Sequence, residues 1–384
     1  MLKVITVFGT RPEAIKMAPL VKELQAHQGE INCKVAVTAQ HREMLDQVLD
    51  LFKITPAYDL NIMREGQNLF DITGRALSGL QQVLLREKPD LVLVHGDTTT
   101  TFVAALAAFY LQIPVGHVEA GLRTKNKFSP YPEEMNRRLT GSLADLNFAP
   151  TSTAKQNLLD EGVAAATIFV TGNTVIDALM ATVRPGYRFA DPFLGGIDYG
   201  RRKILLVTTH RRENLGEPMR EIYRALRDVV RDYPDVEVVF PVHKNPAVRS
   251  VVKAELGGLK RVHLIEPMDY EPFVNVIGCS YLVLSDSGGI QEEAPSLGKP
   301  VLVLRDTTER PEAVAAGTVR LIGTTRDAVA METRRLLDDE GFYKTMANAV
   351  NPYGDGRASE RIARAILFKF GLTAEKPREY RPAY

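Results

Sequence analysis

The segment of residues 281–304 has a pattern that could bind phosphate. It reads as a buried strand, a turn at Ser287, Gly288 and Gly289, a short acidic helix and a second buried strand. The turn offers backbone N–H groups at a helix N-terminus, and glycines carry no Cβ that would keep an anion away from them. Glu293 follows about one helical turn later, where its carboxylate could accept hydrogen bonds from sugar hydroxyls. A tight strand-to-helix turn with acids that match the helix dipole would have the same pattern.

Other polar residues follow the expected strands at their carboxyl ends, where ligands bind in open parallel sheets. They lie in five segments: Gly9–Lys16, His95–Thr101, His117–Arg123, Thr209–Asn214 and His243–Asn245. Four of the seven histidines belong to these segments and have charged neighbours. This clustering predicts a shared crevice between two domains.

Several of these residues also have a purely structural interpretation. Asp97 could be the N-cap of the threonine-rich helix start that follows it. Glu133 and Glu134 could complement a helix dipole, or pair with Arg137 and Arg138 at i,i+4. The sequence alone leaves both interpretations open.

Two kinds of motif are absent from the sequence. No HxxxH, CxxC or dense carboxylate cluster has the spacing of metal ligands, so we expect no metal. The first strand-to-helix turn, Gly9–Glu13, is not GxGxxG, and no Walker A loop occurs. A nicotinamide-dependent oxidoreductase and an ATPase are therefore disfavoured.

Size and composition indicate a globular protein with two domains. The 384 residues exceed the length at which a single core usually stops growing. Lys and Arg (48) balance Asp and Glu (47), so bulk charge does not point to nucleic acid or to an anionic membrane. No segment approaches the roughly 20 apolar residues of a membrane span, and the N-terminus does not read as a signal peptide. We therefore expect a cytoplasmic protein.

Short β-branched runs alternate with helix-like segments along the chain, which predicts parallel sheets with helices on both faces. Six runs in each half imply an α/β protein with two doubly wound, Rossmann-like domains. We place the N-terminal domain at residues 1–172 and the C-terminal domain at 173–357. A further amphipathic helix and a polar tail are expected over 358–384.

Motifs spread along the chain resemble those of one family, in matching order. They are Val7–Lys16, His95–Thr99, His117–Arg123, Pro130–Glu134, Thr209–Asn214, Asp286–Glu293 and Arg305–Glu312. By these motifs the chain is identified as a member of the bacterial, non-hydrolysing UDP-N-acetylglucosamine 2-epimerases. The resemblance implies the glycosyltransferase-B (GT-B) architecture, in which the two domains face a central cleft that holds the active site. It also implies that the C-terminal helix crosses back to the first domain, that no cofactor is used, and that the chain forms a homodimer.

The resemblance implies roles for single residues as well. Family catalytic positions are Lys16, Asp97, Glu119, Glu133 and His210. Family substrate-binding positions are Arg11, Arg137, Ser287, Gly288, Gly289, Arg310 and, at the uridine ribose, Glu293. Which carboxylate acts as the acid and which as the base stays open.

The implied chemistry explains why such residues are needed. No adjacent carbonyl acidifies the proton on C2 of the sugar, so without an oxidising cofactor its removal must be coupled to departure of UDP from C1. The products are 2-acetamidoglucal and UDP, which recombine after a proton reaches the opposite face of C2. This scheme needs a base, an acid, and cations that stabilise the leaving diphosphate. The product, UDP-N-acetylmannosamine, would serve cell-surface polysaccharide synthesis.

Many bacterial relatives have a second, regulatory UDP-N-acetylglucosamine site beside the active site. Four residues match positions used there: Gln40, His41, Arg211 and His243. However, Gly66 stands where some of those relatives have an arginine, and Glu43 stands where they have a glutamine. A cation and an amide donor of that site are therefore missing.

Other functions remain compatible with the sequence. They include a glycosyltransferase of the same architecture, a hydrolysing epimerase, an epimerase of a diacetamido-uronic sugar nucleotide, and a nucleotide-sugar sensor without turnover. The extra carboxylates at the strand ends argue against simple transfer, and the apparently complete acid–base set argues against a sensor.

Overall fold

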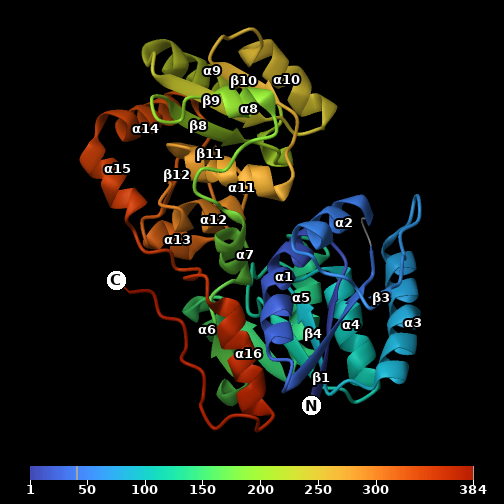
Figure 1. Ribbon diagram of the computed structural model, residues 1–384. Helices are drawn as coiled ribbons and strands as arrows, with labels where there is room; N and C mark the ends of the chain where they lie inside the picture. Colours follow the sequence, from blue (N-terminus) through green and yellow to red (C-terminus); the bar gives the residue numbers. More distant parts are fainter. Residues whose placement is uncertain (40–41, 384) are drawn as a thin grey trace. The chain divides into compact units, whose positions relative to one another are not determined.

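The computed structural model describes residues 1–39 and 42–383. The chain forms two compact units, which Figure 1 shows in colours that follow the sequence. Unit 1 comprises Met1–Ala181 and Tyr353–Arg381, and unit 2 comprises Thr182–Pro352 together with Pro382 and Ala383. Unit 1 thus extends past the boundary expected after residue 172, and its second segment begins at Tyr353 instead of residue 358.

Unit 1 is built on a seven-stranded sheet with the strand order β3-β2-β1-β4-β5-β6-β7. The strands are β1 (Leu2–Phe8), β2 (Ile31–Val37), β3 (Tyr58–Asp59), β4 (Leu91–His95), β5 (Val115–Val118), β6 (Leu146–Ala149) and β7 (Ile168–Val170). All neighbouring strands are parallel. The sequence predicted six of the seven. It missed β3, whose two residues pair only with Ala36 and Val37.

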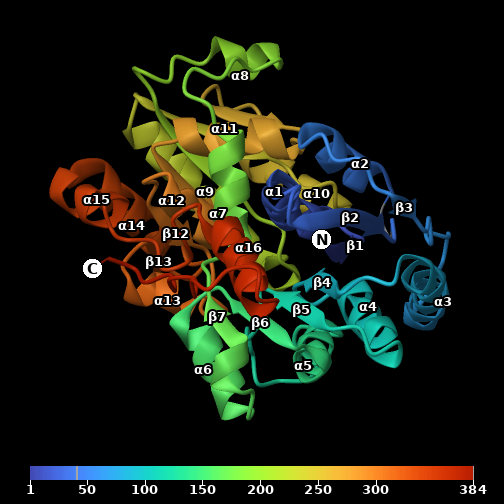
Figure 2. The same ribbon diagram turned by 60° about the horizontal axis from the view of Figure 1, so that its bottom comes forward.

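Helices follow the strands of unit 1 in the order of the chain. They are α1 (Arg11–Ala26), α2 (Arg42–Leu51), α3 (Leu69–Glu87), α4 (Thr99–Tyr110), α5 (Glu133–Leu143), α6 (Ser152–Asp160), the 3-10 turn η1 (Ala165–Thr167), α7 (Thr174–Thr182) and α16 (Ala358–Lys369). Crossovers between parallel strands are right-handed, and the strand order reverses its direction between β1 and β4. For this reason α1 and α2 cover one face of the sheet, while α3, α4 and α5 cover the other (Figures 1 and 2).

Unit 2 repeats this design with a six-stranded parallel sheet of order β10-β9-β8-β11-β12-β13. Its strands are β8 (Lys203–Thr208), β9 (Val236–Pro241), β10 (Val262–Ile265), β11 (Leu282–Ser285), β12 (Val301–Val303) and β13 (Val319–Leu321). Its helices are α8 (Pro192–Gly196), η2 (Arg212–Asn214), α9 (Glu217–Asp232), α10 (Pro246–Leu256), α11 (Tyr270–Cys279), α12 (Ile290–Ser296), α13 (Pro311–Ala315), α14 (Arg326–Asp338) and α15 (Glu340–Ala347). The six apolar runs expected in this half all correspond to strands of the sheet.

The cores of both units follow from burial of the strands on both faces. Residues 91–94 of β4 are completely buried, as are residues 204–207 of β8. In unit 1 these strands pack against α3 and α4, and in unit 2 they pack against α9 and α10. Continuous apolar runs are what a doubly covered parallel sheet requires, which is why the sequence pattern located the strands so well.

The C-terminal helix α16 is part of unit 1, where it packs against α1 (Figure 2). Its first turn is held by the buried Asp177 of α7, whose carboxylate accepts hydrogen bonds from the backbone N–H groups of Ala358 (3.1 Å) and Ser359 (2.7 Å). A carboxylate at this position satisfies unpaired donors and complements the helix dipole. Among the described residues, no helix combines the length and the apolar content needed to cross a bilayer.

Candidate active site

The predicted site residues of unit 1 gather where the strand order reverses. In doubly wound sheets this is the place where loops on neighbouring strands diverge and leave a crevice. Lys16 lies in the second turn of α1, after β1, while Asp97 follows β4 and Glu119 follows β5. These three strands are neighbours in the order β1-β4-β5, so residues far apart in the sequence meet at one edge of the sheet.

Glu119 is the centre of this group. Its carboxylate forms an ion pair with Lys16, and both side chains are largely buried (8% and 18% exposed). The imidazole Nε2 of buried His95 lies 3.9 Å from Glu119 Oε2, and Asn173 Nδ2 donates a hydrogen bond to the same oxygen at 2.7 Å. A carboxylate with an ammonium, an amide and an imidazole around it is well placed to exchange protons.

The backbone at Glu119 is in an unusual conformation. Its φ of +64° lies in the left-handed region, which residues other than glycine seldom adopt. Two residues later, Gly121 has a φ of +90°, and a Cβ there would lie 2.2 Å from the carbonyl oxygen of Ala154. Only glycine can bring this loop so close to α6. Local strain of this kind is concentrated at functional sites, which makes the turn after β5 a functional candidate in its own right.

Asp97 pairs with Arg137 of α5. The cap of α4 is Thr98, whose Oγ1 accepts a hydrogen bond from the N–H of Thr101 at 3.2 Å, so the interpretation of Asp97 as the N-cap is wrong. Burial raises the pKa of Asp97, and the adjacent Arg137 guanidinium only partly offsets this effect. A carboxyl group with a raised pKa is a candidate for holding and releasing a proton.

Glu134 has a structural role in the same region. It is completely buried and accepts hydrogen bonds from the N–H groups of Thr124 (3.1 Å) and Lys125 (3.3 Å). Its ion pair with Arg137 is at i,i+3, with 3.5 Å between Oε2 and Nη1, and not the i,i+4 contact with Arg138. Glu134 therefore anchors the loop that precedes α5.

Two predicted site residues have no such partners. The side chains of Arg11, the first residue of α1, and Glu133, the first residue of α5, form no hydrogen bond or ion pair with other described residues. Both are partly exposed and therefore accessible to a ligand.

A residue that the motif analysis did not single out connects the loops after β1 and β4. The carboxylate of Glu13 is buried and accepts hydrogen bonds from the N–H groups of Gly9 (3.1 Å) and Thr10 (2.8 Å). It also accepts hydrogen bonds from the hydroxyls of Thr98 (2.7 Å) and Thr101 (3.1 Å). The spacing of Thr10 and Glu13 is that of a capping box, but the contact with the second loop leaves no local signal in the sequence.

In unit 2, the strand order reverses between β8 and β11, and there His210 meets Asp286. Asp286 is completely buried, and its carboxylate accepts hydrogen bonds from the N–H groups of His210 (3.0 Å) and Arg211 (2.9 Å) and from Asn214 Nδ2 (3.1 Å). Although burial alone would raise the pKa of Asp286, the contacts with His210 and Arg211 outweigh it and lower the pKa.

His210 is oriented by this aspartate. Its Nδ1 lies 3.1 Å from Asp286 Oδ1, an acceptor that favours a proton on Nδ1. The other nitrogen, Nε2, is then the one able to accept a proton, and the side chain is 40% exposed. Asp286 is the first residue of the family-like motif Asp286–Glu293 but was not among the predicted site residues.

The turn between β11 and α12 contains Ser287, Gly288 and Gly289. The N–H of Ser287 donates to Ser285 Oγ at 2.9 Å, which fixes the start of the turn. A Cβ at Gly288 or Gly289 would come no closer than 3.9 Å or 3.8 Å to another described atom, so packing inside unit 2 does not require glycine at either position. A ligand that contacts the backbone would require it.

The remaining predicted residues of unit 2 are held by neighbouring side chains. Glu293 accepts a hydrogen bond from the hydroxyl of Tyr270 at 3.2 Å, and Arg310 forms an ion pair with Glu292. The hydroxyl of Thr308 donates to Gln291 Oε1 at 2.6 Å, so the loop that precedes Arg310 is tied to α12.

Two of the four residues predicted for a regulatory site, Gln40 and His41, lie outside the described residues. The other two lie beside His210. The ring of His243 is stacked on that of His210, with 5.9 Å between the ring centroids. Arg211 follows His210 in the chain, and its Nη2 lies 3.6 Å from Glu309 Oε1.

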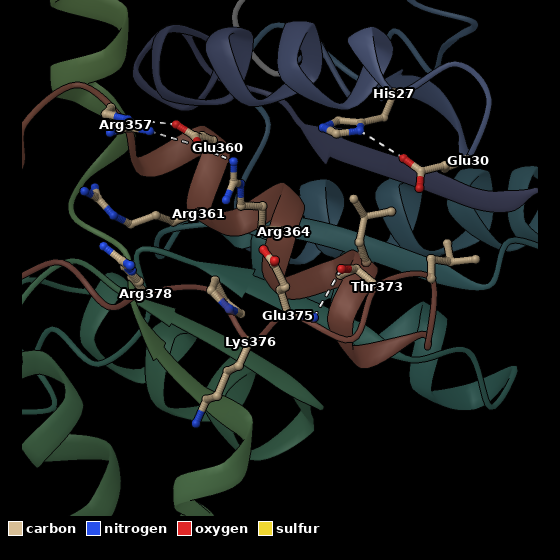
Figure 3. A pocket seen from close by; sticks show the side chains of 13 residues that line it. His27, Glu30, Arg357, Glu360, Arg361, Arg364, Thr373, Glu375, Lys376 and Arg378 are labelled. Carbon is tan, nitrogen blue, oxygen red and sulfur yellow. Dashed lines mark hydrogen bonds and ion pairs between the residues drawn. The ribbon is translucent and has the colours of Figure 1, made fainter.

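A cavity of about 870 Å³ lies elsewhere in unit 1, lined by α16, the end of α1 and the C-terminal segment (Figure 3). Most of the side chains that line it are charged, but Arg357 and Arg364 both pair with Glu360, and Arg361 pairs with Asp355. It contains none of the predicted site residues. Among the described residues, no group of three or more His, Cys, Asp or Glu side chains could hold a metal ion.

Comparisons with known proteins agree with the resemblance. The family model described as UDP-N-acetylglucosamine 2-epimerase matches residues 22–367. A UDP-N-acetylglucosamine 2-epimerase of Bacillus subtilis is 59% identical over 376 residues, which cover 98% of each chain. The crystal structure of the UDP-GlcNAc 2-epimerase from Neisseria meningitidis, bound to UDP-GlcNAc, has a TM-score of 0.87 and 54% identity, and the match covers 95% of this chain and 100% of that one.

A more distant likeness identifies the architecture. The sucrose-phosphate synthase of Thermosynechococcus elongatus is only 13% identical but has a TM-score of 0.63 over 97% of this chain and 100% of the other. Together with the epimerase structures, it shows that the fold is GT-B-like.

Two buried histidines in unit 1 predict how its stability depends on pH. Burial lowers the pKa of His95 to about 3 and that of His117 to about 4, so both rings stay neutral in the folded state. Unfolded histidine takes up a proton near pH 6.5, so the unfolded state gains protons first and stability falls as the pH drops below that value. Between pH 7 and pH 5 we expect the free energy of unfolding to fall by about 2 kcal/mol per histidine.

Urea unfolding at pH 5 and pH 7 measures this loss. In the His117→Asn variant, the fall in the free energy of unfolding that the two histidines cause between pH 7 and pH 5 should be about half as large. The reason is that the variant takes up one of these two protons on unfolding instead of both. Equal pH dependence in wild type and variant would show that His117 is not neutral in the folded state. Burial raises the pKa of Glu13 and Asp97, so their protonation favours the folded state as the pH falls. Because both carboxyls are present in wild type and variant, the difference between the two proteins isolates the contribution of His117.

Proposed function

The chain belongs to the UDP-N-acetylglucosamine 2-epimerase family (EC 5.1.3.14), and we propose that it inverts C2 of this sugar nucleotide by eliminating UDP and adding it back. The observation that carries the proposal is the partly buried group of Lys16, Asp97 and Glu119 beside the ends of three neighbouring strands. It combines proton-exchanging carboxylates with a cation, which is what this reaction needs and what simple glycosyl transfer does not.

The proposed reaction balances without an oxidant or a reductant. A base removes the proton from C2, the C–H electron pair forms the C1=C2 double bond, and the C1–O bond breaks with its electrons on UDP. The intermediate pair is 2-acetamidoglucal and UDP. In the return step an acid protonates C2 from the opposite face, and a diphosphate oxygen bonds to C1. The net change is inversion at C2, which gives UDP-N-acetylmannosamine.

In unit 1 the surroundings of the carboxylates suggest which one donates a proton and which one accepts it. The raised pKa of Asp97 supports a role as proton donor, whereas the pairing of Glu119 with Lys16 supports a role as proton acceptor. Glu133, without a partner among the described residues, is the third carboxylate available for proton transfer. Arg11 likewise has no paired acid there, so its charge is available to the leaving diphosphate, with Arg137 as a second cation.

In unit 2 we assign the contacts with UDP. The N–H groups of Ser287, Gly288 and Gly289 would meet the diphosphate, Glu293 would bind the ribose hydroxyls, and Arg310 would supply further positive charge. His210, with Nδ1 on Asp286, would present Nε2 to the substrate. The Neisseria meningitidis relative was crystallised with UDP-GlcNAc, which supports the choice of ligand. We place the reaction in the cytoplasm, where it would provide N-acetylmannosamine units for cell-surface polysaccharides.

An exposed apolar surface supports the proposed homodimer. Leu85, Phe109 and Tyr110 are 52%, 55% and 65% exposed, and they lie near the C-terminal ends of α3 and α4. These helices pack against each other on one face of the sheet of unit 1. Large apolar side chains grouped on neighbouring helices are typical of a protein interface, and we propose that a second copy of the chain covers them.

The catalytic assignment predicts the effect of three single substitutions. Asp97→Asn, Glu119→Gln and His210→Ala should each lower kcat by at least about 100-fold, the usual contribution of general acid–base groups. The measurement is the rate of epimerisation of UDP-N-acetylglucosamine, with circular dichroism as the check on folding. Asp160→Asn, which changes an exposed carboxylate of α6, is the matched control and should behave as wild type. Near-normal turnover in any of the three variants would remove that residue from the mechanism.

The dimer assignment predicts a change in molecular mass. Phe109→Glu places a charge in the apolar surface and should shift the protein from dimer to monomer in sedimentation equilibrium. Met331→Glu, at a side chain of α14 that is 59% exposed, is the control and should leave the mass unchanged. A dimer that tolerates Phe109→Glu at micromolar concentration would show that the interface lies elsewhere.

A further inference from the structure

Asn173 lies beside Glu119, although 54 residues separate the two in the sequence. It belongs to the turn between β7 and α7, at an edge of the sheet where sequence analysis expected no site residue. The residue is 2% exposed, and its Nδ2 donates a hydrogen bond of 2.7 Å to Glu119 Oε2. A buried amide in direct contact with a catalytic candidate can influence the reaction without touching the substrate.

Two hydrogen-bond donors contact the same oxygen of Glu119. Lys16 Nζ and Asn173 Nδ2 each contact Oε2, and they come from α1 and from the turn before α7. One donor alone leaves a carboxylate free to rotate about its terminal torsion, which has a broad energy profile. Two donors from different elements fix the plane of the carboxylate and hence the position of Oε1 as well.

The turn that carries Asn173 is itself held firmly. The Oδ1 of Asn173 accepts a hydrogen bond from the N–H of Val175 at 3.2 Å, and its own N–H donates to the carbonyl oxygen of Tyr353 at 2.6 Å. Next to it, Gly172 has a φ of +83°, and a Cβ there would lie 3.2 Å from the Cα of Gly354. The side chain of Asn173 is therefore held by the start of α7, and its backbone is held by the segment that leads into α16.

We propose that Asn173 is a positioning residue, which holds the Glu119 carboxylate in the orientation needed for proton transfer at C2. The proposal rests on the proposed function, in which Glu119 exchanges that proton. Asn173 does not contact the reacting atoms; it acts through Glu119. Because general acid–base catalysis needs the two heavy atoms of the proton transfer within hydrogen-bond distance, a small rotation of the carboxylate lowers the rate strongly.

Two substitutions separate this role from simple packing. Asn173→Asp has the same shape and keeps the acceptor for the N–H of Val175, but it replaces the donor with a negative charge facing Glu119. Asn173→Ala removes the donor and the acceptor and adds no charge. If Asn173 only fills space and caps α7, the aspartate variant is the milder change. If it positions Glu119, the aspartate variant is the more harmful one.

The measurement is steady-state epimerisation of UDP-N-acetylglucosamine by the full chain. We expect kcat to fall about 10-fold in Asn173→Ala and about 100-fold in Asn173→Asp, with KM changed less than about 3-fold, the pattern of an interaction needed in the transition state. Binding of UDP, measured by calorimetry, should stay as in wild type in both variants. The control is Asn68→Asp at the exposed N-cap of α3, where Oδ1 accepts hydrogen bonds from the N–H groups of Phe70 (2.9 Å) and Asp71 (3.1 Å), so that the same exchange again keeps the cap acceptor. It should keep kcat within about 3-fold of wild type.

Three outcomes would overturn the inference. They are a milder loss in Asn173→Asp than in Asn173→Ala, losses in kcat that merely follow a fall in the folded fraction, and a similar loss in the Asn68→Asp control. The Glu119→Gln variant distinguishes this failure from failure of the premise. An active Glu119→Gln enzyme would refute the catalytic role of Glu119, whereas an inactive one combined with a fully active Asn173→Asp would refute only the positioning role.

Discussion

The Glu119 carboxylate and the Lys16 ammonium lie together in a largely buried part of unit 1, and this contact constrains much of the structure around it. A buried ion pair is tolerated only when further polar groups complete its hydrogen bonds. Here the loops after β1, β4, β5 and β7 all contribute to that environment. The left-handed backbone of Glu119, the close approach of Gly121 to α6 and the amide of Asn173 are the local means by which these loops converge.

The same principle of organisation recurs in both units with different groups. In unit 1 the buried carboxylate of Glu13 ties the loop after β1 to the loop after β4. In unit 2 the buried carboxylate of Asp286 accepts a hydrogen bond from the backbone of the loop after β8 and orients the His210 ring. In each case an acid at the point where the strand order reverses satisfies donors of the neighbouring loop.

The sequence predicted the parts of the fold that depend on local pattern. Continuous apolar runs located twelve of the thirteen strands, because a parallel sheet covered on both faces buries every residue of a strand. The two-residue β3 escaped detection since it is too short to form a pattern. Likewise, the choice between Asp97 and Thr98 as the cap of α4 could not be made locally, because it depends on Arg137, forty residues away.

The candidate site was predicted through family motifs, and its supporting residues were not. Glu13 contacts Thr101 over 88 residues, and Asn173 contacts Glu119 over 54. Contacts over such separations leave no periodicity or spacing in a single sequence. The roles of the motif residues themselves rest on the family and on chemistry, and the geometry adds the burial and the contacts that make those roles physically reasonable.

In the proposed mechanism, C2 of the sugar loses its proton and regains one from groups that exchange with solvent, while UDP departs and returns. The most direct measurement is to incubate the purified protein with UDP-N-acetylglucosamine in D₂O, without any added cofactor, and to follow the sugar by proton NMR. From the proposed mechanism we expect UDP-N-acetylmannosamine to appear, with deuterium at C2 in both epimers. Epimerisation with retention of the C2 proton, or release of free N-acetylmannosamine and UDP, would contradict it.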